Sequence, residues 1–366
     1  MKNAPQGLHC GGAARIEFCF FQCYTVLIGR KEQISRCMAV KKISIKDIEG
    51  VRIGNAQDEA AATGCTVFLC EQGAPAGMDI RGGGPASRES SLLDPFTASD
   101  EIHAVLLSGG SAFGLDAAGG VQKYLEERGI GFETGAGKVP LVCQSCLFDL
   151  SVGDPRVRPD QAMAYEACKN AQKANYTDGN QGAGTGATVG KLYGMEYCMK
   201  SGIGSCAVQI GDLKIGAVAA VNALGDIFDW KTGKKAAGLL AEDRKTFRST
   251  EQEMYRSYQI RKNKFVGNTT LGVILTNAEF HKPELSKIAG MAHNGYAGAI
   301  RPVHTTADGD SIYALSLGKV AADLDVVGTL AARVMSEAVL RAVCSAESAY
   351  GCPSAKELTE YHRTQE

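Results

Sequence analysis

The chain lacks an excess of charge of either sign. Lys and Arg together number 39 and Asp and Glu number 40 among 366 residues, so the formal net charge is -1. A near-neutral chain has no general electrostatic attraction to nucleic acid or to an anionic membrane surface. We therefore expect no nucleic acid and no membrane among its partners.

An uninterrupted apolar stretch long enough to span a bilayer is also missing. Residues 16–28 are mostly apolar, but Glu17 and Gln22 interrupt them and the stretch is too short for a transmembrane helix. No A-x-A-like cleavage site follows it, as a signal peptide would require. We expect a cytoplasmic protein in which residues 1–37 form a poorly ordered N-terminal extension.

The 13 cysteines have no disulfide-framework spacing, and their number is odd. The single C-x-x-C pair, Cys143 and Cys146, has no second pair and no histidine pair to complete a zinc site. We predict no metal and expect buried, reduced thiols in the apolar stretches. These thiols are Cys65, Cys70, Cys206 and Cys344.

Familiar nucleotide and serine-hydrolase motifs are absent. The P-loop pattern fails at Thr185 and Leu192, and the dinucleotide pattern G-x-G-x-x-G fails at Ala187. Around Ser111 the G-x-S-x-G pattern is displaced by one residue. We predict no cofactor. The histidines at 103, 281, 293 and 304 are candidate bases, but the sequence pairs none of them with a nucleophile.

The chain instead has 44 glycines and many short apolar segments, which is typical of a compact α/β protein with tight turns. Stacked sheets flanked by helices and a doubly wound sheet both fit the alternation of strands and helices. Residues 230–264 are densely charged and are interpreted as a connection, and the chain after Ser345 as a frayed polar tail. The expected strands are 51–53, 66–69, 104–107, 203–210 and 215–221, and the expected helices begin near Phe113, Asp160, Pro283 and Asp325.

The most informative segment is Gly267-Asn268-Thr269-Thr270, where a basic, polar stretch ends and a buried strand begins. This layout suits a chain that cuts itself between Asn268 and Thr269. The freed N-terminal threonine would then be a nucleophile, because its own α-amine, with a pKa of about 7.7–8.0, can take up the hydroxyl proton. A turn before a strand explains the same residues without any chemistry.

Such a nucleophile needs a donor to the oxyanion and charged groups that hold it and tune its proton affinity. Asn222, at the end of an apolar strand, is a candidate amide donor to the oxyanion, or else a turn residue. Asp308 and Asp310 are two carboxylates in one tight turn, or an ordinary Asp-Gly hairpin. Lys191 is a candidate for tuning the proton affinity of the threonine, or a surface lysine.

Several ordered motifs together resemble the DmpA-type aminopeptidase family, which includes β-peptidyl aminopeptidases, pantetheine hydrolases and nylon-oligomer hydrolases. The resemblance extends over residues 43–343. Its motifs are Arg81-Gly-Gly-Gly-Pro-Ala-Ser-Arg88-Glu89, Leu107-Ser-Gly-Gly-Ser-Ala-Phe-Gly-Leu115, Gly182-Ala-Gly-Thr-Gly-Ala187 with Gly190-Lys191, Lys200-Ser-Gly-Ile-Gly204, Asn222, Gly267-Asn-Thr-Thr270 and Asp308-Gly-Asp310.

The resemblance implies a four-layer αββα sandwich whose precursor cuts itself into α and β subunits. These would be residues up to Asn268 and from Thr269, within one domain of residues 38–345, followed by the polar tail 346–366. It also implies assembly into tetramers or larger rings.

By position, Thr269 matches the nucleophile and Asn222 the oxyanion asparagine. Lys191, Asp308 and Asp310 match the threonine-nucleophile branch, in which nylon-oligomer hydrolases lie. The aminopeptidase branch instead has a serine nucleophile, with a serine and a glutamate at the two aspartate positions.

Substrate-binding positions implied by the same motifs are Gly109, Gly110 and Phe148. Many relatives have an active-site tyrosine where this chain has Phe148, which offers no hydroxyl. The predicted function is hydrolysis of a small peptide or amide through an acyl-enzyme. Two alternatives are acyl transfer to an amine, as in ornithine acetyltransferase-like relatives, and a non-catalytic ligand binder suggested by the glycine loops.

Overall fold

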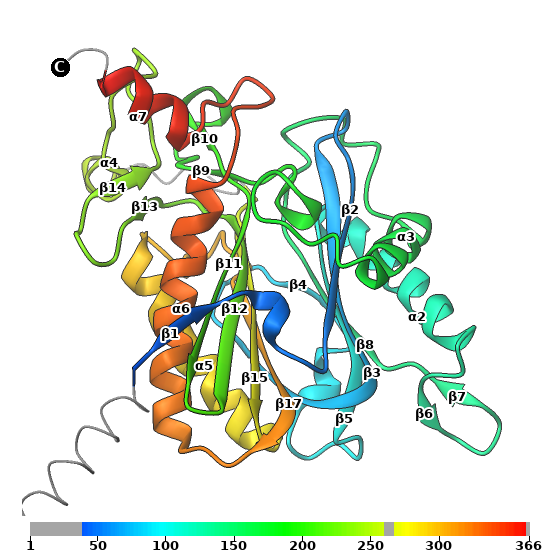
Figure 1. The fold of residues 1–366 in the computed structure, drawn as a ribbon. Helices are drawn as coiled ribbons and strands as arrows, with labels where there is room; N and C mark the ends of the chain where they lie inside the picture. The colour runs from blue at the N-terminus through cyan, green and yellow to red at the C-terminus, as the bar shows by residue number, and fades with distance from the viewer. Residues whose placement is uncertain (1–38, 260–266, 364–366) are drawn as a thin grey trace, which may run out of the picture.

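The computed structural model describes residues 39–259 and 267–363. The N-terminal extension predicted for residues 1–37 lies outside this range. Ten strands form one hydrogen-bonded sheet (Figure 1). In spatial order they are β1 (Lys41–Ile43), β11 (Ile203–Ile210), β12 (Leu213–Asn222), β15 (Thr269–Ala278), β17 (Ser311–Val320), β3 (Thr63–Ile80), β5 (Glu101–Ser108), β8 (Val142–Cys146) and β4 (Ala86–Arg88), with β2 (Arg52–Asp58) also on β3.

The long strand β3 joins two halves of this sheet. Its first part pairs with β2 and β5, and its last part, near Ile80, pairs with β17. The smaller strand pairings are β9 (Thr188–Val189) with β10 (Met199–Lys200), β13 (Asp226–Phe228) with β14 (Lys235–Ala237) and β16 (Ile300–Arg301), and β6 (Phe132–Glu133) with β7 (Lys138–Val139).

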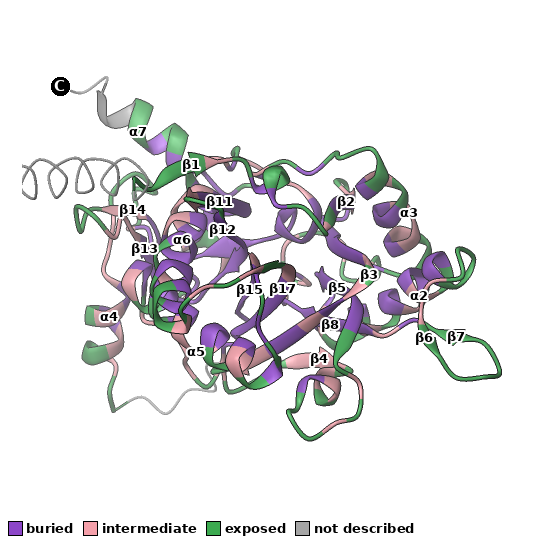
Figure 2. Ribbon diagram, turned by 60° about the horizontal axis from the view of Figure 1, so that its bottom comes forward, coloured by how far each residue is buried: buried purple, intermediate pink, exposed green. Residues whose placement is uncertain are grey.

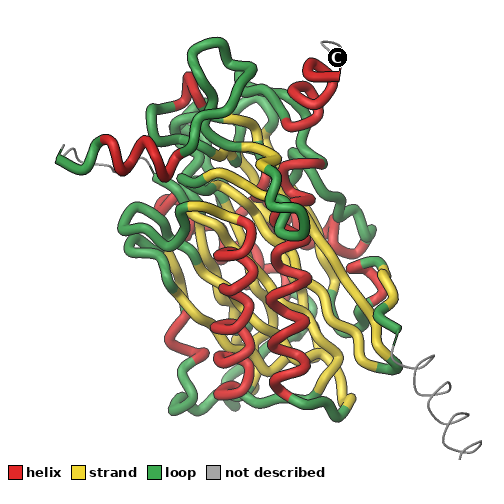
Figure 3. The backbone as a smooth tube through the Cα atoms, turned by 90° about the vertical axis from the view of Figure 1, so that its left-hand side faces the viewer, coloured by secondary structure: helices red, strands yellow, loops and turns green. Residues whose placement is uncertain are grey.

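Helices cover the outer face of each half, and Figure 3 shows two long helices lying across the strands. The helices are α2 (Ala118–Glu126), α3 (Gln161–Gln172), α4 (Thr250–Arg256), α5 (Lys282–Ala299), α6 (Leu324–Cys344) and α7 (Ala355–Arg363). Short 3-10 helices are η1 (Ile45–Asp47), η2 (Ser90–Leu93), η3 (Ser111–Ala117), η4 (Gly182–Gly184) and η5 (Met195–Tyr197).

Three apolar clusters separate these layers. One packs α5 and α6 against the half that contains β12 and β15, a second fills the space between the two halves, and a third packs α2 and α3 against β3 and β5. In Figure 2 the strands in the interior are buried, and the exposed residues lie mainly on loops and on the outer parts of the helices. The layer order is helix, sheet, sheet, helix, which confirms the predicted αββα sandwich.

The two-residue period of a strand decides which cluster each side chain joins. Along β17, Ile312 and Ala314 belong to the cluster under α5 and α6, whereas Tyr313 and Leu315 belong to the cluster between the halves. A strand that is apolar on both faces is therefore buried on both faces. This is why the central strands appear in the sequence as continuous apolar runs.

Most of the expected elements are present. β11 and β12 correspond to the expected strands 203–210 and 215–221 and form a hairpin, with Ile210 opposite Leu213, and α5 has its proline in the first turn. From the sequence, Asp325 is the residue expected to cap the last long helix, and this is wrong: Asp323 is the cap and accepts a hydrogen bond from the Val326 amide at 3.0 Å. Asp325 lies inside the first turn, where its charge still complements the helix dipole.

The frayed tail expected after Ser345 is also wrong for the part that the structure describes. Ala346 and Cys352 are buried, and the Pro353 carbonyl accepts a hydrogen bond from the Lys200 amide at 2.9 Å. The segment is ordered because it supplies an acceptor and small apolar side chains to the edge of β10. Cys344, expected to be buried, is exposed at the end of α6.

Within residues 39–259 and 267–363, no helix is both long enough and apolar enough to cross a membrane.

Candidate active site

Thr269 is the first residue of β15, in the middle of the sheet. It lies opposite Asn222 of the antiparallel strand β12, and on its other side β15 runs parallel to β17. Asn268 and Thr269 are both buried. The Thr269 hydroxyl donates a hydrogen bond to the carbonyl oxygen of Asn268. The structure thus places the predicted nucleophile beside the carbonyl group of the bond that it is predicted to cut.

Lys191 is fully buried next to this bond. Its ammonium donates to Asn222 Oδ1 at 2.7 Å, to the Asn222 carbonyl at 3.0 Å and to the Gly267 carbonyl at 3.3 Å. All three acceptors are neutral. Burial lowers the pKa of Lys191 from 10.5 to about 7. It is therefore a buried amine that titrates near neutral pH, not the surface lysine of the alternative interpretation.

The side-chain amide of Asn222 is oriented by its partners. Its Oδ1 accepts from Lys191 and from the Thr188 amide at 3.1 Å. Since an ammonium can only donate, the other end of the amide is the NH₂ group, and this group donates to the Phe148 carbonyl at 2.8 Å. Thr188, which the sequence analysis did not select, shares the task of holding this amide.

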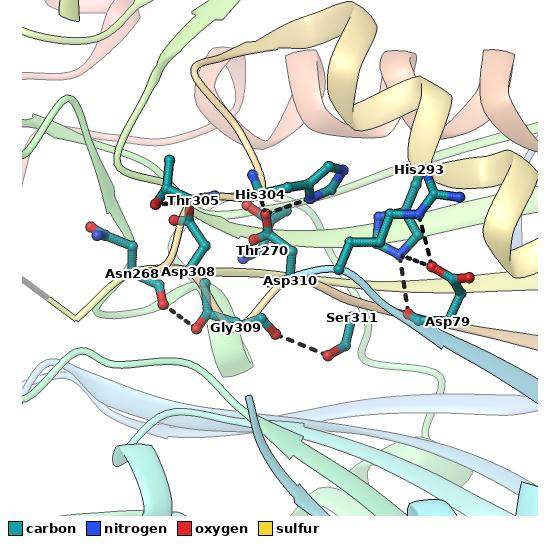
Figure 4. Close-up of polar contacts among 12 residues, drawn as sticks. Asp79, Asn268, Thr270, His293, His304, Thr305, Asp308, Gly309, Asp310 and Ser311 are labelled. Carbon is teal, nitrogen blue, oxygen red and sulfur yellow. Dashed lines mark hydrogen bonds and ion pairs between the residues drawn. The ribbon is translucent and has the colours of Figure 1, made fainter. Parts of the chain in front are cut away.

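Asp308 lies in the turn beside Asn268. The amide and the hydroxyl of Thr305 donate to Asp308 Oδ2 at 2.8 Å and 2.6 Å, as Figure 4 shows. Burial, with a further contribution from the charge of Asp310, raises the pKa of Asp308 from 3.8 to about 6. The predicted carboxylate pair is therefore a pair of interacting buried groups.

Asp310 connects this turn to the strand of Thr269. Its Oδ1 accepts from the Thr270 amide at 2.7 Å. Its Oδ2 accepts from the backbone amide of His304 at 3.1 Å and lies 2.9 Å from His304 Nδ1 (Figure 4). His304 has a φ of 58°, which is uncommon for a residue other than glycine. In the sequence alone His304 is a candidate base without a partner, because its contact with Asp310 forms only when the turn folds.

Gly309, between the two aspartates, touches the nucleophile. A Cβ at this position would lie 2.7 Å from Thr269 Oγ1 and 2.9 Å from the Gly84 carbonyl oxygen. The glycine thus lets the turn approach the threonine hydroxyl more closely than a side chain would permit.

The predicted substrate-binding positions lie around Phe148. Its ring packs so closely on Gly267 that a side chain there would collide with it. The Gly110 amide donates to Asp149 Oδ1 at 2.8 Å, and a side chain on Gly109 would collide with the same carboxylate. Asp149 also accepts from the Thr63 hydroxyl at 2.7 Å. The structure therefore joins Gly109 and Gly110 to the Phe148 turn through Asp149, a residue that the sequence analysis missed.

In the described part of the chain, no group of three or more His, Cys, Asp or Glu side chains is arranged to hold a metal ion. The chemistry that the geometry supports is acyl transfer. A hydroxyl lies against a carbonyl, the buried amine of Lys191 donates to the Gly267 carbonyl on one side, and the Asp310 carboxylate accepts from the Thr270 amide on the other.

Comparison with known proteins agrees with this chemistry. The model of peptidase family S58 matches residues 44–356. An uncharacterised aminopeptidase of Mycobacterium leprae is 36% identical over 87% of this chain and 94% of its own length. A 6-aminohexanoate-oligomer endohydrolase of Kocuria sp. is 30% identical, with 81% of this chain and 84% of that protein covered.

A solved structure has the same fold. The L-aminopeptidase D-Ala-esterase/amidase of Ochrobactrum anthropi, described as a variant of the Ntn hydrolase fold, superposes with a TM-score of 0.62 at 17% identity. The superposition covers 88% of this chain and 94% of that one.

Proposed function

The chain belongs to peptidase family S58 and is a peptidase or amide hydrolase, and we propose that it cuts its own Asn268–Thr269 bond and then uses Thr269 as an N-terminal nucleophile. The observation that carries this proposal is the contact between the Thr269 hydroxyl and the Asn268 carbonyl at the first residue of β15. Lys191 donates to the carbonyl of Gly267, the residue before Asn268, and Gly309 lies against the Thr269 hydroxyl.

In the first acyl transfer, Thr269 Oγ attacks the Asn268 carbonyl carbon. The neutral amine of Lys191, available because its pKa is about 7, takes up the hydroxyl proton. The C–N bond then breaks, the threonine nitrogen gains a proton, and an ester joins Asn268 to Thr269 Oγ. Water hydrolyses this ester to release the Asn268 carboxylate and a free threonine.

In the second acyl transfer, the same hydroxyl attacks the carbonyl carbon of a substrate amide. The free α-amine of Thr269 now takes up the hydroxyl proton and passes it to the leaving amine, and water later hydrolyses the acyl-enzyme. The Asn222 amide group, held by Lys191 and Thr188, donates to the oxyanion. Loss of one such donor typically slows the reaction by about 10²–10³-fold.

Pairing within the sheet explains how two fragments would remain one enzyme. β15, at the start of the second fragment, pairs along its length with β12 of the first, and β17 of the second fragment pairs with β3 of the first. Both fragments contribute side chains to the cluster under α5 and α6 and to the cluster between the two halves. Separation would expose these clusters, so we expect the fragments to copurify. Assembly into tetramers or larger rings remains a prediction, which light scattering would test.

Replacement of the nucleophile tests the proposal. Thr269→Ala should give one band on a denaturing gel and no hydrolysis, where the wild type gives two bands and a second fragment that begins with threonine. Thr270→Val is the matched control, because the buried Thr270 hydroxyl has no partner among the described residues and valine has the same shape. This control should still be cut. A Thr269→Ala protein that splits at this bond contradicts the proposal.

The substrate class that we propose is a small amide with a free amino group, such as an aminoacyl amide or an oligomer of amino acids. A panel of aminoacyl-p-nitroanilides, β-peptides and 6-aminohexanoate oligomers on the processed protein would test it. Hydrolysis of at least one member that Thr269→Ala does not hydrolyse supports the assignment. Formation of an acylated product only when an amine acceptor is added would favour acyl transfer instead.

A further inference from the structure

Two cysteines outside the proposed active site face each other. The sulfur atoms of Cys198 and Cys352 are 3.3 Å apart, although the two residues are 154 positions apart in the chain. Both are buried, with exposed fractions of 0% and 3%. Within residues 39–259 and 267–363, no other two cysteine sulfurs are hydrogen-bond partners.

The backbone on both sides of this pair is fixed. Cys198 comes directly before β10, and the next residue but one, Lys200, donates its amide to the Pro353 carbonyl at 2.9 Å. Cys352 exchanges backbone hydrogen bonds with Ala349 at 2.9 Å and 3.2 Å. The side chains therefore meet across two segments that are already paired. A disulfide, with its S–S distance of roughly 2.0 Å, requires only a small further approach of the two sulfurs.

The surroundings distinguish the two thiols. Cys352 lines a cavity of about 520 Å³ together with Arg244 and Ser348. The hydrogen bond between Cys352 and Cys198 outweighs burial and, with the nearby charges of Lys200 and Arg244, lowers the pKa of Cys352 to about 7. The same hydrogen bond, with burial, raises the pKa of Cys198. Cys352 lines the cavity and Cys198 does not, so a small solute in the cavity meets the Cys352 sulfur first and Cys198 is placed as the resolving thiol.

We propose that Cys198 and Cys352 form a reversible disulfide when a small hydroperoxide enters this cavity. The Cys352 thiolate attacks one peroxide oxygen, the O–O bond breaks, and a sulfenic acid and hydroxide (or alkoxide) form. The Cys198 sulfur then attacks the Cys352 sulfur, the S–O bond breaks, and water leaves. The two thiols are oxidised by two electrons and the peroxide is reduced, so a dithiol reductant reverses the reaction.

This disulfide has a particular consequence that depends on the proposed function. If the chain is cut at Asn268–Thr269, Cys198 belongs to the first fragment and Cys352 to the second. The disulfide then joins the two fragments covalently. It also fixes β10, whose partner β9 supplies the Thr188 amide to Asn222. Oxidation would therefore lock together the two halves of the enzyme beside its proposed active site.

The test is oxidation of the purified full-length protein. After hydrogen peroxide and alkylation, a non-reducing denaturing gel should show the fragments running as one band, and dithiothreitol should restore two. Peptide mapping should identify Cys198 linked to Cys352, with a mass loss of about 2 Da for the two thiol hydrogens. Cys198→Ser should abolish the link. Cys344→Ser, which removes an exposed thiol of the same fragment as Cys352, should not.

The outcomes separate the two proposals. A single band even with reductant means that the chain is not cut, and the peptide map of the intact chain then still decides whether the disulfide forms. A peptide map of oxidised wild type without the Cys198–Cys352 peptide overturns the disulfide, whatever the state of processing. Loss of the link in Cys344→Ser would assign it to another pair and overturn it equally.

Discussion

Gly309 offers a direct test of whether the Thr269 hydroxyl is the reacting group. The backbone at this position does not have a positive φ, so alanine is compatible with the turn itself. Its Cβ, however, would lie 2.7 Å from Thr269 Oγ1, where ordinary contacts begin at 3.4 Å. The Gly84 carbonyl, at 2.9 Å from the same Cβ, limits movement of the turn in another direction.

The Gly309→Ala substitution should therefore move the threonine hydroxyl by about 0.7 Å, because rotation of a side chain is easier than displacement of two backbone segments. Overpacking of this size costs about 1–3 kcal/mol of stability. Misplacement of a reacting atom by about 1 Å can cost a factor of 10² in rate. We expect processing and hydrolysis to slow by about 10–100-fold in a protein that remains folded.

The assay follows the fraction of uncut chain with time after synthesis, alongside thermal unfolding. Gly298→Ala is a control for the loss of a glycine. Gly298 lies in helix α5, and a Cβ there would meet nothing closer than Ser336 Oγ of α6, at 3.4 Å. Alanine there should leave processing unchanged and add up to about 1 kcal/mol of stability. A Gly309→Ala protein that folds, and cuts itself at the wild-type rate, would refute the role of the Thr269 hydroxyl.

Two further predictions concern the neighbouring groups. The pKa of Lys191 is lowered on folding, so between pH 7 and 10.5 the unfolded chain keeps a proton that the folded chain releases. The unfolding free energy of uncut Thr269→Ala protein should therefore rise with pH in this window, and this lysine contributes up to about 1.4 kcal/mol per pH unit. Urea titrations at several pH values measure this dependence, and Lys191→Met should make the unfolding free energy less dependent on pH. In the otherwise wild-type chain, His304→Leu should slow processing about 10-fold, because Asp310 loses a hydrogen-bond partner. His304→Asn should recover part of the rate, because asparagine tolerates the positive φ and can donate to the Asp310 carboxylate. An equally slow His304→Asn on the same gel assay would contradict this role.

The sequence predicted the strand that begins at Thr269 because its signal is local: a polar segment stops and a run of apolar residues follows. The hairpin of β11 and β12 was predictable for the same reason. Asp323 was missed as a helix cap because Asp325 satisfies the same local rule two residues later. The packed segment after Ser345 was missed because its partner, the edge of β10, lies about 150 positions away.

In the candidate site too, residues that match a motif could be predicted, and residues that act through contacts with distant segments could not. Lys191, Asn222, Asp308 and Asp310 could be selected by their match to family motifs, but no local pattern indicates that Lys191 is buried against neutral oxygens. Residues that hold the selected groups have no signal of their own in one sequence. Thr188 and Thr305 act through hydrogen bonds to Asn222 and Asp308, and such pairings appear only when the turns are folded.

The side chain of Asn268, at the predicted cut, is a buried amide that destabilises the uncut fold. Neither polar atom of the Asn268 side chain has a hydrogen-bond partner among the described residues, although the residue is only 2% exposed. Each unsatisfied buried group of this kind costs about 1–3 kcal/mol. Cutting after Asn268 makes it a chain end that is free to leave the site and become hydrated. The uncut fold thus contains a local cost that cleavage would remove, on the same residue whose carbonyl contacts the Thr269 hydroxyl.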